Sequence, residues 1–394
     1  MIVVITVHGI GFQQPPSLDG KVAGYADRLH DNLRQVLHAD LGDDPHRLTR
    51  GQHGPVYVQS NWPPFEGPTE EGVKRLGTWA NEAHTQIDAN TAPALVSTGQ
   101  IAHVVLVYSG LEEEQWDPAT LLPLGSLALP VLTHYATVRG VIQMAVRDFE
   151  GILHHSPGHG SGSPSLTPRS DRPNAKVRVL PNLPAPAAHA AGLPGASVLD
   201  ALKQVEDDVG GYVARNELRE RVRVFVSEAI ARVCGRGDVE RVFLNTHSNG
   251  SVVGFDALKT LNPLLAGKIG AFVTAGSPLR KYVTLLSWGS DCGQIVDIPR
   301  WLNFWDDADP VADPLDPGVT WKRGNAFPDP AAGHLFAEIQ SATSLRPKVI
   351  EEVQVHNITF SDGGGLQAHN YWDNQDEFVK PLAEVLDTAP SPSP

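Results

Sequence analysis

The chain has 394 residues, 41% of them hydrophobic and 19% charged, which is enough for one large core or two modest ones. The formal net charge of −14 leaves no basic surface for neutralising phosphates, so we expect no nucleic-acid partner and no affinity for anionic membranes. The two cysteines, Cys234 and Cys292, are too few for a disulfide scaffold and lack metal-ligand spacing, although one disulfide between them stays open. We expect neither a metal nor another cofactor.

Two apolar segments bear on membranes and targeting. The N-terminal run MIVVITVHG has no positively charged start and no cleavage site after a long apolar region, so it does not predict a signal peptide. We therefore expect a cytoplasmic protein. The apolar segment at residues 121–149 is interrupted by Pro123, Pro130, Arg139 and Arg147, so it does not predict a stable membrane span of about 20 residues.

Hydrophobic patterning predicts an α/β fold. Continuous β-branched runs without alternation are typical of parallel strands covered on both faces, and apolar residues at helical spacing predict covering helices. Strand and helix segments alternate, which predicts a mostly parallel, doubly wound sheet with helices on both faces. In chain order we expect strands at residues 2–7, 56–60, 103–108, 241–245, 271–275, 301–305 and 353–360, and helices at residues 21–41, 73–87, 216–234, from 249 onward and at the C-terminus.

Residues 110–200 interrupt this rhythm. Their first part is apolar, whereas residues 156–194 are rich in Gly, Ser, Pro and Ala, which predicts an irregular loop. The many apolar side chains favour an inserted cap or lid that closes a pocket over a site, and the alternative is a surface excursion packed on the sheet edge. We expect residues 1–394 to form a single domain with this insertion.

The junction of the fourth predicted strand and the helix after it carries a candidate nucleophile, Ser248. A serine hydroxyl needs an exposed, sharply turned position where a base and oxyanion donors converge. The run Thr246-His247-Ser248-Asn249-Gly250 approaches the G-x-S-x-G pattern of a nucleophile elbow, whose small residues allow the backbones to approach closely. Thr246 departs from this pattern. The alternative is a serine that only caps the helix.

A second turn is a candidate for stabilising an oxyanion. The run HGIG at residues 8–11 follows the first predicted strand, and α/β sheets place ligand-binding backbone at such strand ends. With Ser248 as the nucleophile, we assign the oxyanion hole to the backbone N–H groups of Ile10 and Asn249. Taken alone, the run is equally typical of an ordinary glycine turn.

A nucleophilic Ser248 requires an acid and a histidine at the ends of later strands. His369 has this place, after a glycine-rich loop that follows the last predicted strand. Asp309 is the preferred acid and Asp306 the second choice, because the loop must travel a short way past its strand before it reaches the histidine. The alternative is a calcium site in the aspartate-rich segment 306–316, but the D-x-D-x-D-G spacing and its closing Glu are absent.

Two further residues could compete for these roles. Ser277 is a rival serine, but Pro278 directly after it removes an amide that an oxyanion hole would need, so we expect Ser277 to be structural. His356 lies inside the last predicted strand, where we expect a structural histidine.

These motifs together resemble the α/β-hydrolase superfamily, specifically its bacterial lipase- and esterase-like members. The resemblance spans nearly the whole chain and implies an α/β-hydrolase fold. In such relatives the Asp of a D-P-V type turn and the His of an H-x-Y-W type turn complete the triad, which supports Asp309 and His369. The matching pieces are VHGIG at 7–11, DDVGGY at 207–212, THSNGS at 246–251, AGSPL at 275–279, DADPVA at 307–312 and AHNYW at 368–372.

We therefore expect a serine hydrolase that cleaves carboxylic esters. His369, oriented by Asp309, takes the proton of Ser248 as it attacks the acyl carbonyl, and water then cleaves the acyl-enzyme. The apolar insertion favours a small-molecule or lipid-like ester, but lipases, phospholipases, thioesterases and acyltransferases would use the same residues. The alternative from another class is a noncatalytic binding scaffold with the same fold, which Thr246 favours.

Overall fold

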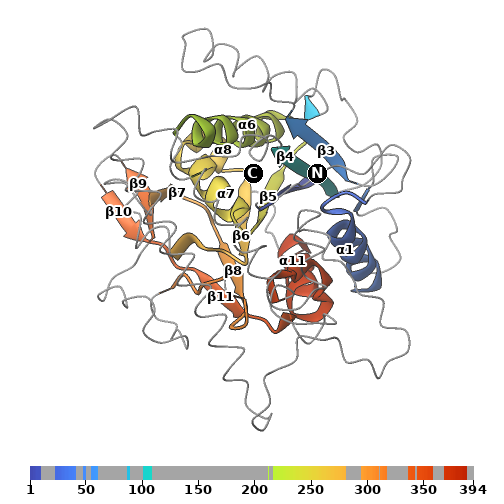
Figure 1. The fold of residues 1–394 in the computed structure, drawn as a ribbon. Coiled ribbons are helices and arrows are strands. Elements are labelled where there is room, and N and C mark those ends of the chain that lie inside the picture. Colours follow the sequence, from blue (N-terminus) through green and yellow to red (C-terminus); the bar gives the residue numbers. More distant parts are fainter. Residues whose placement is uncertain are drawn as a thin grey trace, which may run out of the picture.

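An eight-stranded sheet forms the centre of the computed structural model of the chain (Figure 1). The predicted insertion at residues 110–200, nearly all of the helix predicted at 73–87, and Ile10 lie outside the residues that the structure describes. The described residues are 1–9, 23–40, 48–49, 55–60, 87–88, 101–108, 212, 216–280, 294–309, 311–316, 336–341, 344–357 and 368–387.

Every described strand pair of this sheet is parallel. The strands are β1 (Ile2–Val7), β2 (Leu48–Thr49), β3 (Val56–Ser60), β4 (Ile101–Tyr108), β5 (Arg241–His247), β6 (Ile269–Ala275), β8 (Trp301–Trp305) and β11 (Glu351–Gln354). Their order is β11-β8-β6-β5-β1-β4-β2, and β3 also pairs with β4. Because β1 lies between β4 and β5, both of its edges are hydrogen-bonded, as its unbroken apolar run predicts.

Helices cover both faces of the sheet (Figure 1). On one face lie α6 (Asn216–Gly235), α7 (Gly250–Lys259) and α8 (Pro263–Ala266). The other face carries α1 (Asp27–Asp40), the short turns η4 (Tyr371–Asp373) and η5 (Gln375–Val379), and α11 (Lys380–Asp387). Successive β1 side chains divide between the two cores, with Val3 and Ile5 packed on the α6 side and Val4 on the α1 side. The doubly wound α/β class is thus confirmed.

Two predicted boundaries are wrong by more than two residues. The helix predicted at residues 21–41 begins at Asp27, whose carboxylate reaches back and accepts the N–H of Gly24 at 2.8 Å, as an acid in the first turn of a helix does in a capping box. The strand predicted at residues 353–360 ends at Gln354, and His356 lies beyond it. The His356 N–H donates to Glu377, which takes this amide away from the strand ladder.

A second, three-stranded sheet was not predicted. It consists of β7 (Gln294–Val296), β9 (Ala337–Ser341) and β10 (Ser344–Pro347), in the order β10-β9-β7. All four β10 residues are exposed, so they carry no buried hydrophobic pattern to mark a strand.

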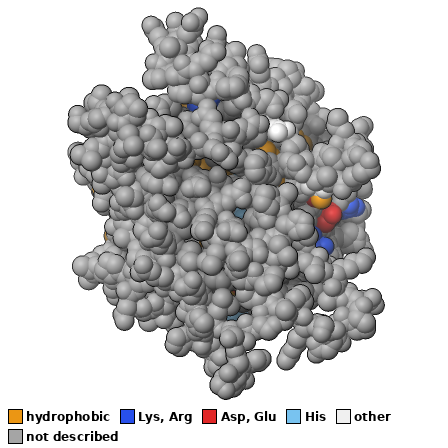
Figure 2. Space-filling view, in the orientation of Figure 1, with side chains coloured by type: hydrophobic (Ala, Val, Ile, Leu, Met, Phe, Trp, Pro, Cys, Tyr) orange, Lys and Arg blue, Asp and Glu red, His pale blue; other side chains and the backbone are white. Residues whose placement is uncertain are grey.

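The described residues contribute mainly to the interior. On the face that Figure 2 shows, their side chains are visible in a few small patches. No helix within the described segments combines the length and the apolar composition that a membrane crossing requires.

A buried polar cluster lies where α1 covers β1 and β4. His103 Nε2 is 2.8 Å from Thr6 Oγ1, and His103 Nδ1 is 3.2 Å from His30 Nδ1. Asn245 donates to the same Thr6 hydroxyl at 3.1 Å. Burial lowers the pKa of the His103 imidazole well below its usual value, and the neighbouring His30 lowers it further. His103 is therefore neutral in the folded protein.

We expect His103→Asn to make folding stability less sensitive to acid. The pKa of His103 is lower in the folded than in the unfolded chain, so its contribution is complete above about pH 6.5 and is lost as the pH falls. That loss amounts to at most about 1.4 kcal/mol per pH unit. The measurement is urea denaturation of wild type and variant at neutral and mildly acidic pH.

The control for this measurement is Asn245→Ala, which removes a polar contact of the same cluster but no titratable group, so it should lower stability by a similar amount at every pH. Burial raises the pKa of the Asp306 carboxyl to about 6 and that of Glu352 to about 7. These raised values make the protein less stable as the pH rises, whereas His103 makes it less stable as the pH falls. Both carboxyls are present in every variant, so the difference between slopes isolates the imidazole. Equal slopes for wild type and His103→Asn would contradict the prediction.

Candidate active site

Ser248 occupies a strained turn between β5 and α7. Its φ of 55° is the only positive value at a non-glycine residue within the described segments. The Ser248 N–H donates to the carbonyl of Ala275 at 2.9 Å, while the Ser248 carbonyl accepts the N–H of Ser251 at 3.0 Å and its hydroxyl at 2.7 Å. Neighbouring elements thus hold the backbone in a conformation that a serine seldom adopts.

Two glycines let the backbones meet at this turn. A Cβ atom at Gly250 would lie 2.2 Å from the carbonyl oxygen of His8 and 2.5 Å from that of Val7. A Cβ atom at Gly9 would lie 2.5 Å from the Ser248 Cβ. The end of β1 therefore passes directly against the Ser248 turn, and side chains larger than hydrogen would prevent this approach.

Thr246, the departure from the elbow pattern, has room because a glycine faces it. Its hydroxyl donates to the carbonyl of Val273 at 2.8 Å, and its methyl group would lie 2.7 Å from a Cβ atom at Gly254 of α7. In the usual pattern a small strand residue leaves room for the helix. Here the strand residue is larger, and Gly254 on the helix leaves the room instead.

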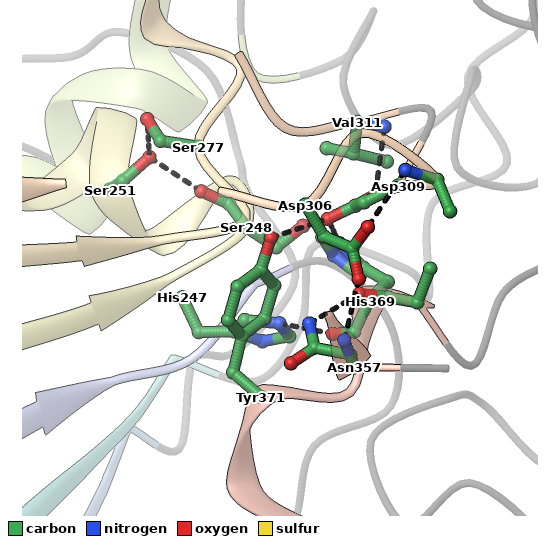
Figure 3. A network of polar contacts seen from close by, with 12 residues as sticks. His247, Ser248, Ser251, Ser277, Asp306, Asp309, Val311, Asn357, His369 and Tyr371 are labelled. Carbon is green, nitrogen blue, oxygen red and sulfur yellow. Dashed lines mark hydrogen bonds and ion pairs between the residues drawn. The ribbon is translucent and has the colours of Figure 1, made fainter. Parts of the chain in front are cut away.

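Asp309 and His369 are in direct contact. His369 Nδ1 lies 2.7 Å from Asp309 Oδ2, and the other carboxylate oxygen accepts the Val311 N–H at 2.9 Å (Figure 3). Asp309 follows β8 and is fully buried, whereas 13% of the His369 side chain is exposed. The contact fixes Nδ1 as the nitrogen that faces the acid, so Nε2 is the ring nitrogen free to exchange a proton with another group.

The His369 imidazole lies against the end of β6, next to the serine turn. A Cβ atom at Gly276 would lie 2.7 Å from His369 Cε1, and Gly276 has a φ of 63°. The residue before it, Ala275, accepts the Ser248 N–H. Ser248 and His369 therefore lie against consecutive residues of the same strand end. Within the described part of the chain, the Ser248 hydroxyl makes no hydrogen bond.

His247 holds the backbone of His369 by a hydrogen bond, a role that the sequence did not suggest. Its Nε2 donates to the His369 carbonyl at 2.9 Å, and its Nδ1 accepts the Tyr25 hydroxyl, 3.1 Å away. Burial, reinforced by His369, lowers the pKa of His247 to about 3, so the ring stays neutral and keeps this donor and acceptor pattern.

Asp306, the second choice for the acid, hydrogen-bonds to backbone groups of its own loop and of the segment after β11. Its carboxylate accepts the N–H groups of Ala308 at 2.8 Å and Asn357 at 2.7 Å, which ties the end of β8 to the segment after β11. Burial raises its pKa to about 6. In the part of the chain that is described, no group of three or more His, Cys, Asp or Glu residues is placed to hold a metal ion.

The loop that bears Asp309 is also held by Glu352 of β11. The Glu352 carboxylate accepts the N–H groups of Leu315 at 2.6 Å and Asp316 at 2.7 Å, and the side-chain amide of Asn303 at 2.9 Å. An edge strand thus determines where the loop lies.

The rival serine, Ser277, is packed behind the Ser248 turn. It is fully buried, its hydroxyl lies 2.7 Å from that of Ser251, and it accepts the N–H of Leu279 at 3.2 Å. These contacts agree with the structural role that we expect of it.

Of the two predicted oxyanion amides, one lies among the described residues. Asn249 is buried and precedes the first residue of α7 as its N-cap, without a side-chain cap. Ile10 lies outside the described residues, but the preceding carbonyl, that of Gly9, accepts the Tyr108 hydroxyl at 3.1 Å and the His8 imidazole. These side chains fix the first residues of the glycine turn.

Comparison with protein-family models, with curated proteins and with solved structures gave no match to this chain. The function therefore has to be argued from the geometry alone.

Proposed function

We propose that the protein is a serine hydrolase of the α/β-hydrolase type that cleaves carboxylic esters through an acyl-enzyme. The observation that carries the proposal is the 2.7 Å contact between His369 Nδ1 and the buried Asp309, beside a strained serine turn. A paired acid and imidazole next to a sharply turned serine is the arrangement that nucleophilic acyl transfer requires.

In this mechanism the Ser248 hydroxyl attacks the acyl carbonyl while His369 Nε2 takes its proton. The same imidazole then returns the proton to the leaving alkoxide, and water attacks the acyl-enzyme by the reverse transfer. The buried Asp309 carboxylate stabilises the imidazolium that forms in both steps. The Asn249 N–H at the start of α7, together with that of Ile10, would receive the negative oxygen of the tetrahedral intermediate. The serine and the imidazole need to come within hydrogen-bond reach only when substrate closes the site.

Labelling with a fluorophosphonate probe tests the proposal. We expect one covalent adduct, located by peptide mass spectrometry at Ser248, because the probe reacts only with a serine that has an activating base. Ser248→Ala should abolish the adduct. The matched control is Ser277→Ala, which should label as wild type does.

A folded wild-type protein that takes no label would favour the noncatalytic binding scaffold. An adduct at another serine would overturn the assignment of Ser248 while leaving hydrolysis open. For an active protein, p-nitrophenyl esters of increasing acyl length distinguish the substrate classes. A sharp preference for short acyl groups would favour an esterase over a lipase or phospholipase.

A further inference from the structure

We propose that Tyr371 is a positioning residue for this site. Its hydroxyl holds the Asp309 carboxylate against His369 and partly neutralises the negative charge of that carboxylate next to the imidazole. The inference rests on the proposed function for its consequence in catalysis, and on the contacts of Asp309 for its structural part.

Two donors share one oxygen of Asp309. The Tyr371 hydroxyl donates to Oδ2 at 3.0 Å, and His369 Nδ1 contacts the same atom at 2.7 Å (Figure 3). The Val311 N–H occupies Oδ1 at 2.9 Å, so the carboxylate is held at both of its oxygens. Tyr371 itself is fully buried and packs edge-on against Phe378, with ring centroids 5.9 Å apart. Its hydroxyl is therefore placed by packing and cannot swing away.

A donor on Oδ2 has a predictable effect on the imidazole. It stabilises the carboxylate charge locally, so less of that charge is available to stabilise a proton on His369. Without the Tyr371 hydroxyl, the carboxylate would favour the imidazolium form more strongly, and a larger fraction of His369 would be protonated at a given acidic pH. A protonated His369 cannot accept the serine proton.

Several titratable groups face this pair, and they constrain the test. His369 contacts Asp309 and lies 4.5 Å, ring to ring, from His247. His247 stays neutral across the useful range because burial lowers its pKa to about 3. Asp306 lies beside Asp309, and burial raises its pKa to about 6, so it titrates in the same window. Since Asp306 is unchanged in the variants, only differences from wild type are interpreted.

The test is Tyr371→Phe, which removes the hydroxyl and keeps the ring. In nitrogen NMR of histidine-labelled protein, we expect the titration midpoint of His369 to rise by about 0.5 to 1 pH unit. In ester hydrolysis, the acidic limb of kcat/KM should move by the same amount, which lowers activity about three- to tenfold below the midpoint and little on the plateau.

The matched control is Tyr57→Phe. The Tyr57 hydroxyl also donates to an aspartate, Asp27 Oδ1 at 2.8 Å, and it accepts the Ala26 N–H at 3.0 Å. The same hydroxyl is thus removed from a tyrosine that is bonded to neither Asp309 nor His369. In the Tyr57→Phe protein, the titration midpoint of His369 and the pH profile of kcat/KM should equal those of wild type. Fluorotyrosine at position 371 keeps the hydroxyl and strengthens it as a donor, so it should move the His369 midpoint to lower pH.

An unchanged His369 midpoint in Tyr371→Phe and in the fluorotyrosine protein would overturn the inference. So would an activity loss of the same factor at every pH, because that pattern indicates loosened packing alone. If wild type hydrolyses no ester and takes no fluorophosphonate label, the proposed function fails. The NMR titration would still decide whether Tyr371 governs the Asp309 and His369 pair.

Discussion

Asp309→Asn is expected to lower kcat for ester hydrolysis by about 10³- to 10⁴-fold while leaving the fold intact. The amide is nearly isosteric with the carboxylate. With its oxygen at the Oδ1 position it can still accept the Val311 N–H, while its NH₂ group at the Oδ2 position faces His369 Nδ1 and the Tyr371 hydroxyl. It carries no charge to stabilise the imidazolium of His369. Its NH₂ group would also favour the tautomer with the proton on Nε2, the nitrogen that must accept the serine proton. The measurement is steady-state kinetics with a short p-nitrophenyl ester.

Asp306→Asn is the matched control for this substitution. Asp306 accepts backbone N–H groups of Ala308 and Asn357, so its replacement should cost folding stability but keep kcat within about tenfold of wild type. The reverse result, with the larger kinetic loss in Asp306→Asn, would assign the acid to Asp306 and contradict the geometry of the pair.

Gly250→Ala should destabilise the protein by about 3 kcal/mol or more, the largest stability effect that we expect of any single methyl group. The added Cβ would lie 2.2 Å from the His8 carbonyl oxygen and 2.7 Å from the His8 carbonyl carbon. These are backbone atoms of the residue directly after the central strand, so no side chain can rotate to make room. Either β1 or α7 must move, and the serine turn moves with it. The measurement is the midpoint and slope of denaturant unfolding.

Gly267→Ala provides the control for the added methyl group. Gly267 ends α8 with a φ of −59°, and the nearest atom to a Cβ there would be 3.7 Å away. We expect a change within about 0.5 kcal/mol. A Gly250→Ala protein as stable as this control would show that β1 and α7 can separate without cost.

Elements that are buried on both faces could be predicted from the sequence. Every side chain of β8 is buried, and so is every side chain of β1 except the partly buried Ile2, so composition alone marks the limits of both strands. The elements that were missed or misplaced have two different causes. The strand β10 is fully exposed and pairs with its sequence neighbour β9, so it lacks the buried pattern that marks a strand. The strand β11 ends where Glu377, a residue distant in the sequence, accepts the His356 amide, and no local pattern indicates that partner.

The sequence predicted which residues form the site, but not which side chains hold those residues in place. The order of Ser248, Asp309 and His369 along the chain, each after a strand, indicated that they meet at one edge of the sheet, and the structure brings Asp309 and His369 into contact there. The sequence assigned no role to His247 or Tyr371, although both stand inside the quoted motifs, because they act through contacts across more than 60 residues. Local patterns carry no information about such partners.

The place of β1 between β4 and β5 has a consequence for how the protein is made. Ile2 pairs with Arg241, so the ribosome must deliver more than half of the chain before the central strand gains its second neighbour. Closing so large a loop slows folding, and an apolar strand with an open edge attracts other chains in the interval. We therefore expect the nascent protein to depend on chaperones until β5 emerges.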